Sequence, residues 1–231
     1  MTGRLYGVGV GPGDPELMTL KAVRILSEVS VVAYPAPGEG ESSARKIAAA
    51  FLPAGGTEIA IRIDMRPGPE PMGVYDQAAT EIAVHLDAGR DVAVLCEGDP
   101  FFYGSFAYLY SRLAKRFPTT IVPGVSSLTA CAAASGRPLV SRDESLAVLP
   151  ATLPDEALEE RLHGFDAAAI LKVGRHLPRL QALLGRLGLK DRSTYVAHAS
   201  REIGEVAPLA EVHGKDAPYF SMILVTRNSS P

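Results

Sequence analysis

The chain has 231 residues and a mass of 24.4 kDa, enough for one large domain or two small ones. Hydrophobic residues make up 47% and charged residues 21%, which is ordinary for a soluble globular protein. The net charge of −3 and the pI near 6.0 argue against a basic surface for nucleic acid or an anionic membrane. No apolar run approaches the roughly 20 residues of a membrane span, and the first residues lack the pattern of a signal peptide, so we expect a cytoplasmic protein.

The cysteines and histidines argue against a metal centre. Cys96 and Cys131 lie in apolar stretches without spaced partners, which excludes a disulfide framework and a cysteine zinc site and suits a reducing cytosol. The 5 histidines form no HxxxH or HxH pair. We therefore expect no bound metal.

Short β-like runs alternate with helical stretches along the first half of the chain. In chain order we expect a strand at 4–10, a helix at 14–29, a strand at 30–35, a helix at 42–52, a strand at 58–65, a loop at 65–73, a helix at 74–88, a strand at 91–98 and a helix at 104–116. The helix at 14–29 has a plausible N-cap in Asp14 and a proline at the next position. The pattern predicts an α/β fold.

The second half repeats this pattern. A strand, a turn and a helix follow one another from 119, and we then expect strands at 146–150, 167–174, 193–200 and 219–227, with helices at 154–163 and 177–187. A complete βα set ends at Phe117–Pro118. We therefore expect two α/β domains, 1–117 and 118–231.

Residues 8–22, VGVGPGDPELMTLKA, place glycines between an apolar run and a helix-like stretch, where glycine-rich turns often hold phosphates. The dinucleotide pattern GxGxxG fails in both registers, because Pro12 or Asp14 falls at the last glycine position. Asp14 and Glu16 would also repel a phosphate at the start of the following helix. Taken alone, the stretch is a tight βα turn and a poor phosphate site.

Two further turns of small residues follow apolar strands. LCEGDPFFYGS (95–105) repeats Gly-Asp-Pro, and VPGVSS (122–127) carries a glycine and two serines. Ligands of open α/β sheets bind outside the carboxyl ends of the strands. Three such turns predict a cleft with carboxylates, hydroxyls and backbone groups but no lysine or arginine. That chemistry suits a cation-bearing nucleoside such as S-adenosylmethionine better than NAD or ATP.

These turns resemble those of a known family. GVGPGDPELMTLKA (9–22), CEGDPFFYGSF (96–106) and VPGVSSLTACAAASGRPL (122–139) resemble the tetrapyrrole methylases, the class III S-adenosylmethionine-dependent methyltransferases of cobalamin and sirohaem synthesis. The resemblance runs from the N-terminus to about residue 227. It implies two α/β domains with the cofactor in a trough between them, a tetrapyrrole substrate, no metal, and a homodimer.

The resemblance also implies which residues contact S-adenosylmethionine. Carried over by motif position, they are Pro12, Gly98, Asp99, Phe102, Ser126, Ser127, Val173 and Ala199. In VAHAS (196–200) the contact falls on Ala199 or His198. The chain departs from the family pattern at Val173, where relatives frequently have methionine, and at Thr226, where they often have glycine. Asp14 is more simply a helix cap, Ser126 and Ser127 fit as N-caps, and Asp99 can cap its own turn.

The implied reaction moves a methyl group from a sulfonium to a meso carbon of a dipyrrocorphin, so the main task is alignment of the two carbons. A base is needed only for the proton lost afterwards. His198 is a candidate proton carrier, but the sequence does not identify the base. Arginines should line the site of a substrate with many carboxylates, and the candidates are Arg45, Arg66, Arg137 and Arg142. Tyrosines could line it too, although their helical spacing also fits ordinary packing: Tyr103, Tyr108 and Tyr110.

Other readings stay open. An NAD-dependent oxidoreductase is weakened by the failed glycine pattern, and a non-catalytic nucleoside or tetrapyrrole carrier would use the same cleft. Within the family, the alternatives are methylation of a cobalt-loaded ring, methylation of another ring carbon, and a protein-directed diphthine synthase.

Overall fold

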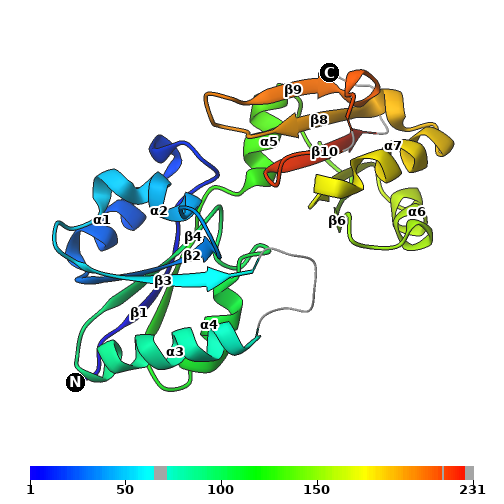
Figure 1. Ribbon diagram of the computed structural model, residues 1–231. Coiled ribbons are helices and arrows are strands. Elements are labelled where there is room, and N and C mark those ends of the chain that lie inside the picture. Colours follow the sequence, from blue (N-terminus) through cyan, green and yellow to red (C-terminus); the bar gives the residue numbers. More distant parts are fainter. Residues whose placement is uncertain (65–71, 215, 227–231) are drawn as a thin grey trace. The chain divides into compact units, whose positions relative to one another are not determined.

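The computed structural model describes residues 1–64, 72–214 and 216–226, and the chain divides into two units, Met1–Ser126 and Ser127–Pro231 (Figure 1). Each unit contains one five-stranded sheet and its own helices. The expected α/β class with two α/β domains is confirmed. The predicted loop at 65–73 lies largely outside the described residues. Within them, no helix is both long and apolar enough to cross a membrane.

The first unit is built on a parallel sheet. Its strands, in the order β3-β2-β4-β1-β5 across the sheet, are β3 (Thr57–Ile63), β2 (Val31–Pro37), β4 (Val92–Cys96), β1 (Leu5–Gly9) and β5 (Thr119–Val122). All neighbouring strands are parallel. The carboxyl ends of β4, β1 and β5 therefore lie side by side at one edge.

Helices cover both faces of this sheet (Figure 1). The helices α1 (Leu20–Glu28) and α2 (Ser43–Ala48) pack on one face, and α3 (Met72–Asp87) and α4 (Phe106–Leu113) pack on the other. Central strand β4 is buried throughout, because alternate side chains enter the two cores. This double burial explains the continuous apolar run of the sequence there.

The second unit has a mixed sheet. Its strands, in the order β6-β7-β10-β8-β9, are β6 (Leu146–Pro150), β7 (Ala167–Leu171), β10 (Ser221–Thr226), β8 (Ser193–Ala197) and β9 (Glu205–Pro208). Only β6 and β7 are parallel; the other pairs are antiparallel. The helix α5 (Ser127–Ser135) packs on one face, and α6 (Asp155–His163) and α7 (Leu177–Arg186) pack on the other.

The predicted helix at 14–29 is wrong at its start. A single 3-10 turn, Pro15–Leu17, comes first, and α1 begins only at Leu20 with Thr19 as its N-cap. The Thr19 hydroxyl accepts from the backbone N–H of Ala22 at 3.2 Å. The break arises because Met18 is extended and its side chain enters the core beneath α1.

Two further differences concern β5 and β9. We expected the boundary after Phe117, but β5 follows that residue and pairs in parallel with β1, so the first unit extends to Ser126. Strand β9 was not predicted. It is an edge strand with mostly exposed residues, and so it lacks the alternation that identifies a half-buried strand.

The packing of β1 gives a test of the first core. A Cβ added to Gly7 would lie 2.4 Å from Cε1 of the buried Phe106 ring. We expect Gly7→Ala to lower the free energy of unfolding by about 1–3 kcal/mol in urea titrations, because overpacking forces shifts in a dense core. The control is Gly73→Ala in α3, where an added Cβ meets nothing within 4 Å; that change should keep or raise stability, by up to about 1 kcal/mol. Equal stability of Gly7→Ala and the unmodified chain would contradict the packing.

Candidate functional site

The three sequence turns of the first unit meet at the carboxyl edge of its sheet. Gly9 ends β1, Gly98 follows β4, and Gly124 follows β5. A Cβ on Gly124 would lie 2.1 Å from the carbonyl oxygen of Gly98, and a Cβ on Gly9 would lie 2.6 Å from the same oxygen. No side chain fits at either position. The three turns therefore pack backbone against backbone at this edge, which the glycines at positions 9 and 124 permit.

Asp99 ties two of these turns together. Its Oδ1 accepts from the backbone N–H of Phe101 at 2.9 Å, and its Oδ2 accepts from that of Gly124 at 3.0 Å. The first bond caps the turn, which is the structural role that the sequence offered for Asp99. The second fixes the β5 turn against the β4 turn. A carboxylate has about four acceptor positions, so the half-buried side chain keeps acceptor capacity for a ligand.

The first turn lies against the second. The N–H of Gly98 donates to the carbonyl of Gly11 at 2.8 Å, and the N–H of Gly11 donates to that of Gly98 at 3.4 Å. Pro12 comes next and is half-buried. Because proline has no N–H, Pro12 can offer a ligand only its ring and its carbonyl. Asp14 accepts from the N–H of Glu16 at 2.9 Å and so caps the 3-10 turn, as its simpler reading predicts.

The other predicted contacts, on the second and third turns, are not part of this close contact. Phe102 is half-buried, with its ring centroid 5.3 Å from that of Tyr103. Ser126 ends the first unit, and Ser127 is the first residue of α5 in the second. The structure thus brings Gly98 and Asp99 together with the Gly11–Pro12 turn.

Val173 and Ala199 follow β7 and β8 in the second unit. Val173 is 0% and Ala199 9% exposed, and their side chains pack in its two cores. Three residues close to them, Lys172, His198 and Ser200, have left-handed backbones with φ of 58°, 49° and 65°. Such conformations are uncommon outside glycine and concentrate at functional sites.

His198 carries a buried polar atom that the rest of the fold does not use. Its backbone N–H donates to the carbonyl of Phe220 at 2.8 Å, which fixes the residue against the start of β10. Its Nδ1 is buried and has no hydrogen-bond partner among the described residues. A buried nitrogen of this kind is costly unless something binds it.

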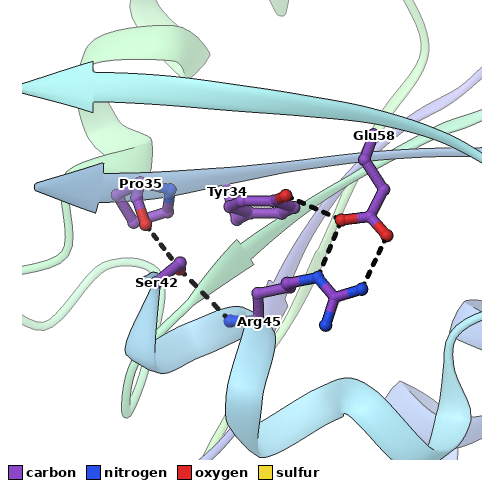
Figure 2. A network of polar contacts seen from close by, with 5 residues as sticks. All are labelled: Tyr34, Pro35, Ser42, Arg45 and Glu58. Carbon is purple, nitrogen blue, oxygen red and sulfur yellow. Dashed lines mark hydrogen bonds and ion pairs between the residues drawn. The ribbon is translucent and has the colours of Figure 1, made fainter. Parts of the chain in front are cut away.

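Arg45, one of the arginines predicted to bind substrate carboxylates, is already paired within the first unit (Figure 2). Its Nε and Nη2 donate to the two carboxylate oxygens of Glu58 at 2.8 and 2.9 Å, and the Tyr34 hydroxyl donates to Glu58 Oε2 at 2.6 Å. The Arg45 hydrogen bond lowers the pKa of Glu58 below its ordinary value. Ser42 accepts from the Arg45 N–H and donates to the Pro35 carbonyl, which anchors the start of α2. Arg45 therefore holds α2 to the sheet edge.

The other arginines and the tyrosines proposed to line the substrate site differ in how exposed they are. Arg137 and Arg142 are exposed in the segment after α5, and Arg66 lies outside the described residues. Tyr108 packs on Tyr75 with ring centroids 4.8 Å apart, so it is a packing residue. Tyr103 and Tyr110 are exposed.

The cysteines offer neither a thiolate nor a metal site. Burial raises the pKa of both free thiols to about 12, which leaves Cys96 and Cys131 as neutral core fillers. Within the described ranges, no group of three or more His, Cys, Asp or Glu side chains could hold a metal ion.

Comparison with known proteins decides the family. Residues 4–212 match the family model of the Tetrapyrrole (Corrin/Porphyrin) Methylases. The chain belongs to the tetrapyrrole methylases. A precorrin-2 C(20)-methyltransferase of Sinorhizobium sp. is 41% identical over 96% of this chain and 95% of its own length. A cobalt-precorrin-2 C(20)-methyltransferase of Salmonella typhimurium is 32% identical over 98% of each. A uroporphyrin-III C-methyl transferase of Thermus thermophilus, solved with S-adenyl homocysteine, superposes with a TM-score of 0.68 and 26% identity over 96% of this chain and 97% of that one.

The glycine contacts among the turns of this tetrapyrrole methylase were not visible in the sequence. The motifs indicated which turns matter, but the approach of Gly9 and Gly124 to a single carbonyl depends on the neighbouring placement of β4, β1 and β5. Phe101 was also missed as a surface residue. Its only signal is its place in the run FFY directly after Gly-Asp-Pro.

The role of Asp99 in binding can be tested by comparison with Asp14, whose carboxylate caps its own turn in the same way. We expect Asp99→Ala to weaken S-adenosylmethionine binding at least tenfold, about 1.4 kcal/mol, in calorimetric titrations. The variant should remain folded but lose about 1–3 kcal/mol of stability, because two backbone donors lose their acceptor. Asp14→Ala is the matched control, since it removes a carboxylate that makes the same kind of local cap, and it should keep the affinity. Unchanged affinity in Asp99→Ala would remove this carboxylate from the binding site.

Proposed function

We propose that this chain transfers a methyl group from S-adenosylmethionine to C(20) of precorrin-2, giving precorrin-3A in cobalamin biosynthesis. The observation that carries the proposal is the 41% identity, over nearly the whole of both chains, to a relative named for this reaction. The stretches VVAYPAP, CEGDPFFYGSFAYLYSRL and PYFSMILVT also look most like this member of the family. The substrate is then a small tetrapyrrole.

The residues of the first unit fit a methyl-donor nucleoside. The backbone packing of Gly9 and Gly124 on the Gly98 carbonyl holds the three turns together, and Asp99 offers a negative charge suited to ribose hydroxyls or a cationic centre. When bound, S-adenosylmethionine supplies a methyl carbon made electrophilic by its sulfonium. We assign the cofactor contacts to the eight residues named from the family pattern: Pro12, Gly98, Asp99, Phe102, Ser126, Ser127, Val173 and Ala199.

The proposal also includes an oligomeric state and a cellular compartment. The family resemblance favours a homodimer, and the two free cysteines, both buried as thiols, fit a reducing cytoplasm.

The proposed reaction predicts a product of defined mass and structure. Incubation with S-adenosylmethionine and precorrin-2 should add the mass of one methyl group to the tetrapyrrole, and product NMR with a labelled methyl should place it at C(20). A signal at another carbon would replace the proposed regiochemistry. No mass gain, with intact binding of S-adenosylmethionine, would favour a carrier over an enzyme.

The metal content of the substrate is the main alternative within this function. The Salmonella relative is named for the cobalt-loaded ring, but its identity to this chain is 32% against 41% for the relative named for precorrin-2. We therefore favour the metal-free ring. Parallel assays with metal-free and cobalt-loaded precorrin-2 distinguish the two.

His198 is our candidate for the base that takes the proton from C(20) after methyl transfer. Its buried, unpartnered Nδ1 and its place beside Ala199 support this assignment. We expect His198→Asn to lower kcat by about 10²-fold or more, with a primary isotope effect on substrate deuterated at C(20), because proton removal becomes rate-limiting. Asparagine tolerates the left-handed backbone, so the fold should persist. His163→Asn makes the same change at an exposed histidine at the end of α6 in the same unit and is the control. Unchanged kcat and no isotope effect in His198→Asn would exclude His198 as the base.

A further inference from the structure

The turn after Asp99 exposes a group of aromatic side chains. Phe101, Tyr103 and Tyr110, here called the aromatic patch, are 51%, 53% and 40% exposed. In the described part of the first unit they are the exposed aromatic residues, and all three fall within ten residues of the chain. Several large apolar rings left in water along one short segment call for an explanation.

The rings of the patch are supported from below. Phe101 meets Tyr110 edge to face, with centroids 5.1 Å apart and planes at 86°, and lies 6.1 Å from the fully buried ring of Phe106. Tyr103 meets the half-buried Phe102 in the same edge-to-face way, at 5.3 Å and 87°. These are favourable geometries for aromatic pairs. The exposed rings are therefore held in place before anything binds them.

Tyr103 occupies its position against a local conformational cost. Its φ is +57°, in the left-handed region that a bulky side chain rarely adopts. The turn enforces this conformation: Asp99 caps Phe101, and an added Cβ on Gly104 would lie 2.4 Å from the carbonyl oxygen of Pro100. Burial does not offset this conformational cost, because more than half of the surface of Tyr103 is exposed. Strain retained without a packing benefit points to function.

We propose that the aromatic patch binds one face of the tetrapyrrole ring during methyl transfer. This inference rests on the proposed function, because it takes the substrate from it. A dipyrrocorphin is a broad, partly conjugated ring whose carboxylates lie at its periphery, and aromatic side chains bind such faces by stacking. The patch begins two residues after Asp99, on the same turn of the same sheet edge. It carries no charge, which suits the ring face rather than the carboxylates.

Rigid aromatic residues are well suited to this task. Each has two side-chain torsions, so little conformational entropy is lost on binding.

The decisive variants change Tyr103 in two ways. Tyr103→Asn removes the ring but tolerates the left-handed backbone, so the protein should stay folded and its unfolding midpoint in urea should not fall. Tyr103→Phe keeps the ring and should keep substrate affinity. Phe165→Asn removes an exposed ring that precedes β7 in the second unit and serves as the control.

Binding is measured with metal-free uroporphyrin, a stable tetrapyrrole with a carboxylate periphery, followed by the change in its absorption. We expect Tyr103→Asn to weaken binding at least fivefold and to raise KM for precorrin-2 more than it lowers kcat, with S-adenosylmethionine affinity unchanged. Phe165→Asn and Tyr103→Phe should match the unmodified chain. The proposal for the aromatic patch would be overturned if Tyr103→Asn and the unmodified chain bound uroporphyrin equally well, or if neither of them bound it. If the unmodified chain binds uroporphyrin and this binding depends on Tyr103, but precorrin-2 is not methylated, the proposed substrate is wrong and the proposal for the aromatic patch stands.

Discussion

The first unit depends on the close approach of three backbone segments at the carboxyl edge of its sheet. The Gly98 carbonyl lies where a side chain on Gly9 or Gly124 would have to stand, so glycine is required on both sides of it. Asp99 then fixes this approach, because its two carboxylate oxygens accept from donors on two different turns. Parallel strands make the arrangement possible, since only parallel neighbours bring their carboxyl ends to a common edge. The turns that carry the family motifs thus form one structural feature.

The same turn has two structural consequences of opposite kind. On its inner side it closes against β1 and β5 through backbone and glycine contacts. On its outer side it projects Phe101 and Tyr103 into solvent, with Gly104 permitting the tight return into α4. One short segment therefore combines a polar anchor and exposed aromatic rings, which are complementary to a nucleoside and to a conjugated ring respectively.

The second unit uses its strand ends differently. Its residues after β7 and β8 send apolar side chains into two separate cores and place left-handed backbones at the sheet edge. Any ligand there would meet main-chain groups and the His198 ring. The Val173 side chain itself packs in the core of this unit.

The sequence by itself determined the α/β class, the three glycine-rich turns and the family, because periodicity, turn residues and motif spacing are local properties. It placed β6 and α7 almost to the residue, since each is a strongly apolar or amphipathic segment between clear breaks. It could not determine that β5 belongs to the first sheet, that Met18 interrupts the first helix to enter the core, or that β9 exists, because each of these depends on a partner distant in the chain. The tertiary structure alone also decided which candidates are free to act. Arg45 is committed to Glu58 and Tyr108 to Tyr75, whereas Tyr103 and His198 retain groups that the fold leaves unused. The physical reason is that a residue type sets what a side chain can do, and only its neighbours in space set whether that capacity is already taken.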